Sequence, residues 1–254
     1  MKKVCLFTLA LVCLATAVYG EVLEMTLDYY PPFEYEENGE TKGIGTDVVK
    51  AVLKEAGMEA KFTQYPFARA YKMVTEGKEP VFYYSLVRTP ERESLVHWVG
   101  VVTSAEQMIM ARKDKNIRIE KIEDLKDKTV GTVIDDVIDQ YLRKHEASLN
   151  LKLDRVADYE PNVNKLMKGR FDMIGINQFV CFYLLEKLGY SKEDVSTVYV
   201  IDDLKKDFYL AANKNVPDDV VKKLQAAFAT VHGSGTYQKI VDEYFGKPEP
   251  PVKQ

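Results

Sequence analysis

Residues 60–86 read AKFTQYPFARAYKMVTEGKEPVFYYSL, and this stretch decides the fold class. Residues 60–64 predict a strand, and residues 67–76 have apolar side chains at helical spacing and stop at Gly77. Residues 80–86 are apolar and aromatic, as in a buried strand. The order strand, helix, strand predicts a parallel α/β unit, because parallel strands need a long crossing connection that a helix supplies.

The segment before this unit adds a strand and a helix. Residues 22–27 alternate apolar and polar side chains and predict a strand, which runs into the proline-broken loop DYYPPF. Thr46 or Asp47 then caps a helix that ends at Gly57. The first part of the chain is therefore expected to form one α/β lobe.

The same pattern starts again after residue 106. The predicted strands cover residues 107–112, 129–134, 171–176 and 196–201, and the predicted helices cover residues 122–125, 135–145, 162–169 and 178–188. A further strand over residues 208–212 precedes two closing helices over residues 218–231 and 236–244. Two α/β units predict two lobes with a hinge, and ligands of such sheets bind beyond the carboxyl ends of the strands.

The first twenty residues have the features of a secretory signal peptide. Lys2 and Lys3 precede an uncharged apolar run over residues 4–18, and Gly20 is a small residue suited to cleavage. We expect cleavage after Gly20 and a periplasmic protein. No apolar run reaches the roughly 18 residues that a membrane-spanning helix needs, so no membrane span is expected.

Charge, cysteines and motifs exclude several other classes of protein. The formal net charge of −4 argues against nucleic acid as a partner. Cleavage would leave Cys181 as the one cysteine, so we expect no internal disulfide and a core position for Cys181 in its apolar surroundings. The sequence has no HExxH, Cys–His metal spacing, GxSxG or P-loop, so we expect no catalytic residue, no metal and no cofactor.

Five parts of the chain resemble the periplasmic amino-acid-binding proteins of ABC importers, the family 3 solute-binding proteins. They are YPPFEY with KGIGTDVVKAVLKEAG, EGKEPVFYYSLVRTPERES, LKDKTVGTVIDD, KGRFDMIGIN and HGSGTYQKIVDEYFG. They occur in the family's order over essentially the whole mature chain.

This resemblance implies a two-lobed periplasmic binding protein fold of type II, with the lobes joined by two crossover strands. Lobe 1 would comprise residues 21–106 and 212–254, and lobe 2 residues 107–211. The resemblance also implies capture of a small polar ligand, an amino acid or a related carboxylate, by lobe closure. The partner expected for delivery of the ligand is an ABC permease.

The resemblance assigns the ligand carboxylate to Arg92. In the family, the arginine of a threonine-x-x-arginine turn holds this group, and the matching turn here is Thr89-Pro-Glu-Arg92. A guanidinium offers a planar fork of donors that suits a carboxylate. Ser85 matches a family position whose hydroxyl or backbone meets the ligand, and Leu86 follows it in the same loop.

Several aromatic residues and one further arginine are candidates for the walls of the cleft. Tyr30 and Phe67 match the family's aromatic walls, although core packing explains Phe67 equally well. Tyr84 is one of several phenols in lobe 1 that are candidates to line the cleft. Arg69 follows Phe67 by two residues and suits either a second anion contact or a surface salt bridge.

The second lobe departs from the family at two places. A glycine and a hydroxyl residue usually begin its first helix, whereas this chain has Asp135 and Asp136 there. Asn177 occupies the place of the aspartate that binds the ligand's ammonium group, and asparagine supplies no counter-charge. Either Asp135 or Asp136 meets the ammonium, or the ligand is not a standard α-amino acid. For closure from lobe 2 we expect Asp136 and Asn177 to contact the ligand.

Two other classes of function remain open from the sequence. A few relatives of this fold are enzymes, such as cyclohexadienyl dehydratases, and others are stand-alone sensory binding modules. The three histidines lie in unrelated places, and no candidate acid or base has an evident partner. A binding protein without enzymatic activity is therefore the expectation.

Overall fold

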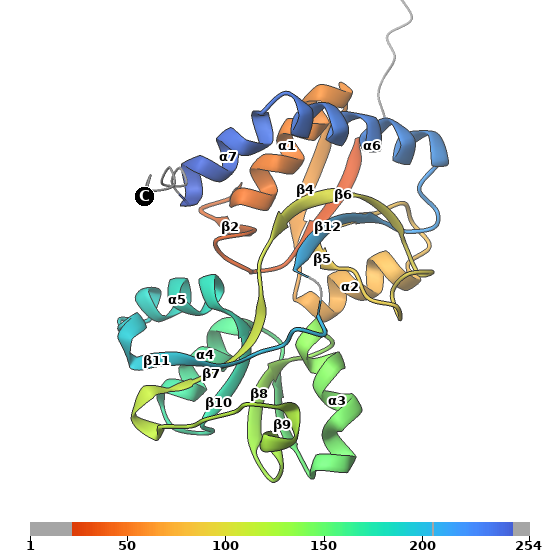
Figure 1. The fold of residues 1–254 in the computed structure, drawn as a ribbon. Helices are drawn as coiled ribbons and strands as arrows, with labels where there is room; N and C mark the ends of the chain where they lie inside the picture. The colour runs from red at the N-terminus through yellow and green to blue at the C-terminus, as the bar shows by residue number, and fades with distance from the viewer. Residues whose placement is uncertain (1–21, 205, 246–254) are drawn as a thin grey trace, which may run out of the picture.

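The computed structural model describes residues 22–204 and 206–245. The expected signal peptide lies outside these residues. Two five-stranded sheets, each packed against helices, form two lobes that lie one above the other in Figure 1. The predicted α/β class with two lobes is confirmed.

Lobe 1 contains a mixed sheet in the order β4-β1-β5-β12-β6. Its strands are β1 (Leu23–Leu27), β4 (Ala60–Gln64), β5 (Phe82–Val87), β6 (His97–Ser104) and β12 (Asp207–Ala212). Its helices are α1 (Ile44–Ala56), α2 (Phe67–Glu76), α6 (Asp218–Gly233) and α7 (Thr236–Phe245). Strand β1 pairs in parallel with β4 and β5, whereas β12 runs antiparallel to β5 and β6.

Lobe 2 contains a second mixed sheet in the order β11-β7-β10-β8-β9. Its strands are β7 (Gln107–Arg112), β8 (Thr129–Val133), β9 (Lys152–Val156), β10 (Met173–Asn177) and β11 (Val195–Val200). Its helices are α3 (Val137–Leu149), α4 (Tyr159–Met167) and α5 (Gln178–Lys187), with short 3₁₀ turns η1 (Lys113–Lys115), η2 (Ile122–Leu125) and η3 (Lys192–Asp194).

Two segments join the lobes and run side by side (Figure 1). The first links β6 to β7, and the second links β11 to β12. The amide of Ala105 donates to the carbonyl of Lys206 over 2.9 Å, and the amide of Ile201 donates to the carbonyl of Gln107 over 2.9 Å. All of β12 pairs within the first sheet, so the return to lobe 1 is complete before Asp207, upstream of the expected boundary at residue 212.

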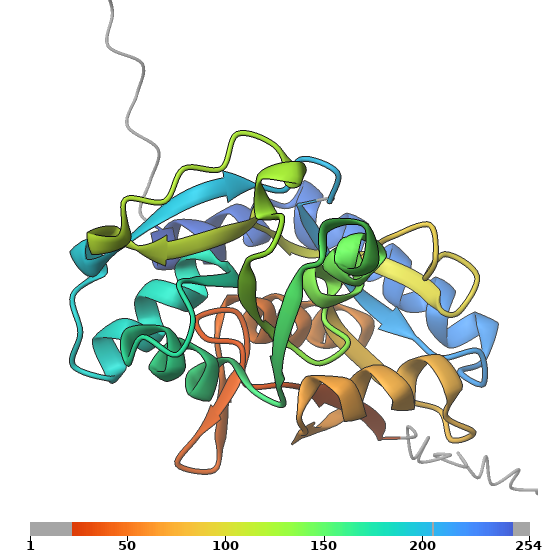
Figure 2. The ribbon, with the colours of Figure 1, turned by 90° about the horizontal axis from the view of Figure 1, so that it is seen from below.

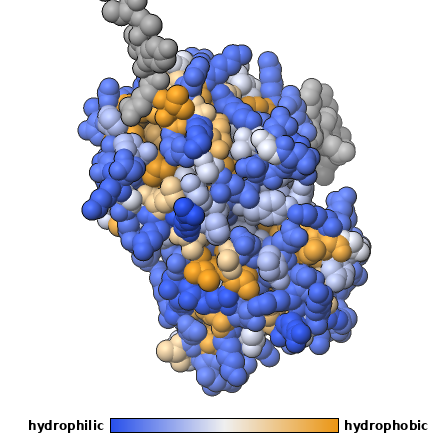
Figure 3. Space-filling view, turned by 180° about the vertical axis from the view of Figure 1, so that it is seen from behind, coloured by the Kyte–Doolittle hydropathy of each residue, from blue (hydrophilic) through white to orange (hydrophobic). Residues whose placement is uncertain are grey.

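A small hairpin of β2 (Tyr35–Glu37) and β3 (Glu40–Lys42) extends from lobe 1 alongside α5 of lobe 2 (Figure 2). The rings of Tyr35 and Tyr183 lie 5.7 Å apart across this contact. Cys181 is buried in α5, which confirms its predicted core position, and burial raises the pKa of its thiol to about 12. This thiol is therefore unreactive at neutral pH. The side of the molecule opposite to Figure 1 is mostly hydrophilic, with apolar areas on both lobes (Figure 3).

The sequence pattern misses strands β6 and β9 and the hairpin. Strand β9 reads KLDRV and lies at a sheet edge, where charged side chains are solvated and no apolar alternation is required. Strand β6 contains Gly100, which weakens a strand signal. A Cβ at Gly100 would lie 2.4 Å from Cγ of Phe228, so the glycine is needed to let α6 pack on the sheet.

Gly131→Ala is expected to destabilise lobe 2 by about 2 kcal/mol, because overpacking a filled core forces side chains to move. The new Cβ would lie 2.3 Å from Cζ of Phe171 and 2.5 Å from Oδ1 of Asn162. Urea unfolding of the ligand-free protein measures the effect. Gly233→Ala is the control, because open space surrounds that position at the end of α6. An equal loss in both variants would contradict the steric explanation.

Candidate functional site

A cavity lies between the lobes, at the carboxyl ends of strands β1 and β5 of lobe 1. Lobe 1 contributes Asp28, Tyr30, Phe67, Tyr83, Ser85, Val87, Arg92 and Phe208, and lobe 2 contributes Gln107, Asp136, Val137 and Tyr159. Its volume is about 20 Å³, because the lobes are in contact around it. The rings of Tyr30 and Tyr159, from opposite lobes, are 4.8 Å apart. The structure thus has the two lobes closed upon each other.

Arg92 reaches from lobe 1 to the first turn of α3 in lobe 2. Its side chain is 1% exposed and stacks on the ring of Tyr71 at 4.8 Å. Nη1 donates to the carbonyl of Val87 over 3.0 Å, and Nη2 donates to Oε1 of Gln140 over 3.1 Å and to the carbonyl of Asp135 over 3.4 Å. The guanidinium therefore lies where the two lobes meet.

This guanidinium is a buried cation without an ion pair. Within residues 22–204 and 206–245, no carboxylate lies within ion-pair distance of Arg92, and its Nε has no hydrogen-bond partner. Burial lowers the pKa of Arg92, against the opposing effects of Tyr71 and Asp136. A buried charge without a counter-charge is costly. The side chain is therefore prepared for an anionic partner, such as a carboxylate that accepts two parallel hydrogen bonds.

Asp28 and Glu34 form a buried carboxyl pair in lobe 1. The hydroxyl of Tyr83 donates to Oδ1 of Asp28 over 2.8 Å, and the hydroxyl of Ser85 donates to Oε2 of Glu34. Burial raises the pKa of Asp28 to about 6 and that of Glu34 well above its usual value, and the negative charge of Asp28 raises the pKa of Glu34 further. Two such neighbouring buried carboxyl groups do not both ionise readily, because each negative charge disfavours the other.

Asp136 caps α3 and faces the cavity from lobe 2. Its Oδ1 accepts the amide of Asp139 over 2.6 Å, and its Oδ2 accepts the hydroxyl of Tyr159 over 3.2 Å. The side chain is 4% exposed, and burial raises its pKa to about 7. Asp135 instead directs its carboxylate to Arg143 and Arg155 on the outside of the lobe. Of the two neighbouring acids, Asp136 alone lines the cavity.

The remaining walls are aromatic. Tyr30 packs against Tyr159 and, at 6.0 Å, against Phe208, while Phe67 contacts Tyr83 edge to face at 5.9 Å. Such walls suit apolar, planar or cationic groups. The cavity therefore combines one guanidinium, the two carboxyl groups of Asp28 and Asp136 and aromatic faces, a set that suits a zwitterionic or cationic molecule.

The model of the family of bacterial extracellular solute-binding proteins, family 3, matches residues 24–247. This chain belongs to that family. The resemblance found in the sequence is thereby confirmed, and with it the periplasmic binding protein fold of type II.

Named relatives of this solute-binding protein cover most of its length. The arginine-binding periplasmic protein of Mannheimia haemolytica is 25% identical over 252 residues, which cover 97% of this chain and 99% of that protein. The arginine-binding extracellular protein ArtP of Bacillus subtilis (strain 168) is 24% identical over 219 residues, covering 85% and 82%. These relatives are binding proteins rather than enzymes.

Solved structures show the same fold. An ancestral arginine-binding protein bound to glutamine has a TM-score of 0.74 at 25% identity, covering 89% of this chain and 98% of that one. A histidine kinase sensor domain similar to periplasmic binding proteins has a TM-score of 0.78 at 18% identity, covering 91% and 99%. Among the described residues of the solute-binding protein, no helix is long and apolar enough to span a membrane.

Strand alternation decides which of the predicted lobe 1 residues reach the cavity. Tyr83, Ser85 and Val87 line it, so Tyr84 and Leu86, between them on β5, face the other side of the sheet. The hydroxyl of Tyr84 lies 2.9 Å from that of Thr46, beneath α1. The prediction that Tyr84 lines the cleft does not fit this register, and Leu86, predicted as a ligand-binding residue, also has its side chain away from the cavity.

Arg69 and Asn177 also lie away from the cavity. The guanidinium of Arg69 stacks on the ring of Tyr65 at 4.3 Å. Asn177 caps α5: its Oδ1 accepts the amide of Phe179 over 2.9 Å, and its Nδ2 donates to the carbonyl of Glu106 over 2.7 Å. Both polar atoms of the Asn177 side chain are therefore engaged within the protein.

Of the predicted site residues, Tyr30, Phe67, Ser85, Arg92 and Asp136 are brought together in the cavity. The sequence did not single out Asp28, Glu34 or Tyr159. Asp28 follows the first strand directly, which is a usable signal in an α/β lobe. Tyr159 carries no such signal, because it reaches the cavity from helix α4, and Glu34 lies behind Ser85 rather than in the cavity.

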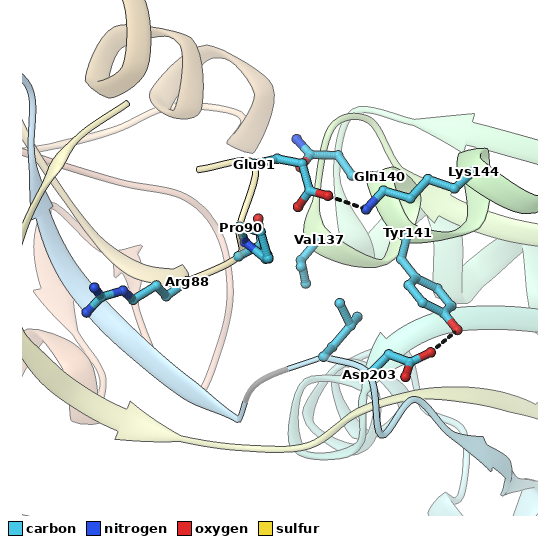
Figure 4. A pocket seen from close by; sticks show the side chains of 10 residues that line it. Arg88, Pro90, Glu91, Val137, Gln140, Tyr141, Lys144 and Asp203 are labelled. Carbon is cyan, nitrogen blue, oxygen red and sulfur yellow. Dashed lines mark hydrogen bonds and ion pairs between the residues drawn. The ribbon is translucent and has the colours of Figure 1, made fainter. Parts of the chain in front are cut away.

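A second, larger space of about 360 Å³ lies on the other side of Gln140, between the turn after β5, helix α3 and the second connection (Figure 4). Lys144 of α3 points to Glu91 of lobe 1, with 2.6 Å between Nζ and Oε1, and Tyr141 donates to Asp203 over 2.8 Å. Of these contacts, the ion pair of Lys144 and Glu91 bridges the two lobes, is exposed and contributes little by itself, whereas the hydrogen bond of Tyr141 to Asp203 at the hinge is partly buried.

Proposed function

We propose that this protein captures a small solute of the amino-acid class between its lobes and delivers it to an ABC permease. The observation that carries the proposal is Arg92, a buried guanidinium without an ion pair at the meeting point of the lobes. A ligand carboxylate supplies the missing counter-charge and accepts the donors of this side chain.

The charges around Arg92 favour a ligand that also carries a positive group. Asp28 and Asp136 line the cavity beside this guanidinium, and a third carboxyl group, that of Glu34, is buried behind Ser85. The relatives described above are named as arginine-binding proteins, and the ancestral arginine-binding protein holds glutamine. A polar α-amino acid, and a basic one first, is the ligand we propose.

Binding is coupled to closure of the two lobes. The ligand first meets lobe 1, which contributes most of the cavity wall, and lobe 2 then closes through the start of α3 and Tyr159. The paired connections between β6–β7 and β11–β12 are the proposed hinge. A ligand that contacts both lobes shifts the population to the closed form, which the permease recognises.

We infer an extracytoplasmic location, after removal of the leader expected at residues 1–20. The family is extracellular, and the relative from Mannheimia haemolytica is named as periplasmic. A free binding protein rather than an enzyme fits both the family and the cavity, whose walls combine recognition groups for charge with aromatic faces.

Titration calorimetry with the common amino acids, polyamines and short carboxylates tests this function. One class is expected to bind with one site per chain, and saturation at about 100 times Kd stabilises the fold by about 2.7 kcal/mol, a thermal shift of about 5–10 °C. The ligand is expected to be recovered unchanged by mass spectrometry after incubation. Absence of binding across the set, or conversion of the bound compound, would overturn the proposal.

A further inference from the structure

The lobe 2 half of the cavity presents a carboxylate. Asp136 reaches the cavity from the start of α3 and is almost fully buried there. A neutral cap such as serine would make the same hydrogen bond to the helix. The acid therefore adds a negative charge that the helix does not need.

Asp136 is the carboxyl group whose charge has the largest effect on the pKa of Arg92. The guanidinium donates to the carbonyl of Asp135, the residue before Asp136, and to Gln140 in the first turn of α3. Asp136 and Arg92 also influence each other's pKa electrostatically. Arg92 has in addition an unpartnered Nε among the described residues. One small molecule can thus meet both side chains at the meeting point of the lobes.

The amino and carboxylate groups of an α-amino acid sit on one carbon atom. When Arg92 holds the carboxylate, the ammonium therefore lies within a few ångströms of it. Arg92 and Asp136 line the same small cavity, so one head group placed there meets both side chains. Charge-assisted hydrogen bonds between ammonium and carboxylate are strong in such a desolvated site.

Other acidic and polar groups suit this role less well. Asn177 carries no charge, and both ends of its amide are bound within the protein. Asp28 lies on the lobe 1 side, where its carboxyl group already accepts a hydrogen bond from the hydroxyl of Tyr83.

We propose that Asp136 is the residue that binds the ligand's α-ammonium group and so determines the preference for amino acids over carboxylic acids that lack the amino group. This inference rests on the proposed function. Asp136 then has two roles: it caps α3, and it supplies the negative charge that faces the ligand's ammonium group.

Matched ligand pairs test the assignment. The probes are arginine with 5-guanidinopentanoate, and glutamine with 4-carbamoylbutanoate, which differ by the amino group alone. Calorimetry gives the selectivity, defined as the Kd of the deaminated acid divided by the Kd of the amino acid. For the wild-type protein we expect a selectivity of about 30 or more for the pair that binds, since a charged hydrogen bond contributes about 1.5–3 kcal/mol.

Asp136→Ser removes the charge and keeps the helix cap. Its selectivity is expected to fall by about 10-fold, with the deaminated acid binding as tightly as before or more tightly, because a repulsive carboxylate is gone. Asp136→Asn is the second variant, since it preserves the size of the side chain. Asp135→Asn is the matched control: it removes a neighbouring negative charge outside the cavity at φ 63°, a conformation that asparagine accepts.

The outcomes separate the two proposals. Unchanged selectivity in both Asp136 variants, or an equal fall in Asp135→Asn, would overturn the role of Asp136. An increase in selectivity for Asn177→Asp without an effect at Asp136 would place the ammonium at Asn177 instead. Absence of binding by all four probes and by the wider set of solutes would reject the proposed function itself.

Discussion

Arg92→Ala is expected to weaken binding of the best amino-acid ligand by about 100-fold or more. The side chain is the one guanidinium that lines the cavity between the lobes, and its removal would leave the ligand carboxylate buried without a counter-charge. Truncation of one partner of a buried charged pair costs about 2–5 kcal/mol. Titration calorimetry with the ligand found by screening measures the loss.

Two variants make this result interpretable. Arg92→Lys keeps the charge but loses the planar fork, so an intermediate loss of about 10-fold is expected. Arg88→Ala is the control: Arg88 is four residues away, pairs with Glu93 at the surface and stacks near Trp98, outside the cavity. Wild-type affinity in a folded Arg92→Ala protein, or an equal loss in Arg88→Ala, would contradict the assignment of the carboxylate to Arg92.

The lobes and most of their elements follow from the sequence because local signals agree with the tertiary fold. Strand β4, helix α2 and strand β7 have the predicted bounds, since apolar spacing, Gly77 and the neighbouring turns all point the same way. Strand β9 could not be predicted, because it is held by pairing with β8 rather than by an apolar pattern of its own.

The site was predictable where residues follow a strand end, and less so elsewhere. Arg92 and Tyr30 lie in loops that come directly after strands, where α/β folds bind ligands. The contact of Arg92 with Gln140, by contrast, depends on how lobe 2 closes upon lobe 1. The spacing of residues within either lobe does not determine how close Arg92 comes to Gln140.

The buried carboxyl groups give the protein a second measurable property, a loss of stability as the pH rises. A carboxyl group whose pKa is raised in the folded protein binds its proton more tightly there than in the unfolded chain. Its contribution to stability is fully present below about pH 4, the usual carboxyl pKa. That contribution is lost as the pH rises through the folded pKa, about 6 for Asp28 and about 7 for Asp136.

The ligand-free protein is therefore expected to be more stable at pH 5 than at pH 8. Between pH 5 and the folded pKa of about 7, Asp136 contributes a loss on the order of 3 kcal/mol, since one pH unit in this range corresponds to about 1.4 kcal/mol. Glu91 does not oppose this loss of stability between pH 5 and pH 8. The hydrogen bond from Lys144 lowers its pKa to about 2, so Glu91 is already ionised throughout this pH range. Urea unfolding at both pH values, without ligand, measures the difference.

Asp136→Asn is expected to flatten this pH dependence, because asparagine caps the helix without ionising. At pH 8 the variant should exceed the wild-type protein in stability, since the wild-type must hold a buried charge there. Asp124→Asn is a control at an exposed carboxyl group whose pKa is lowered rather than raised, by backbone amides of Glu120 and Lys121. Wild-type pH dependence in Asp136→Asn would mean that the acid is solvated in the ligand-free protein, with the lobes open. In that case, protonation of Asp136 would be coupled to closure of the lobes rather than to folding.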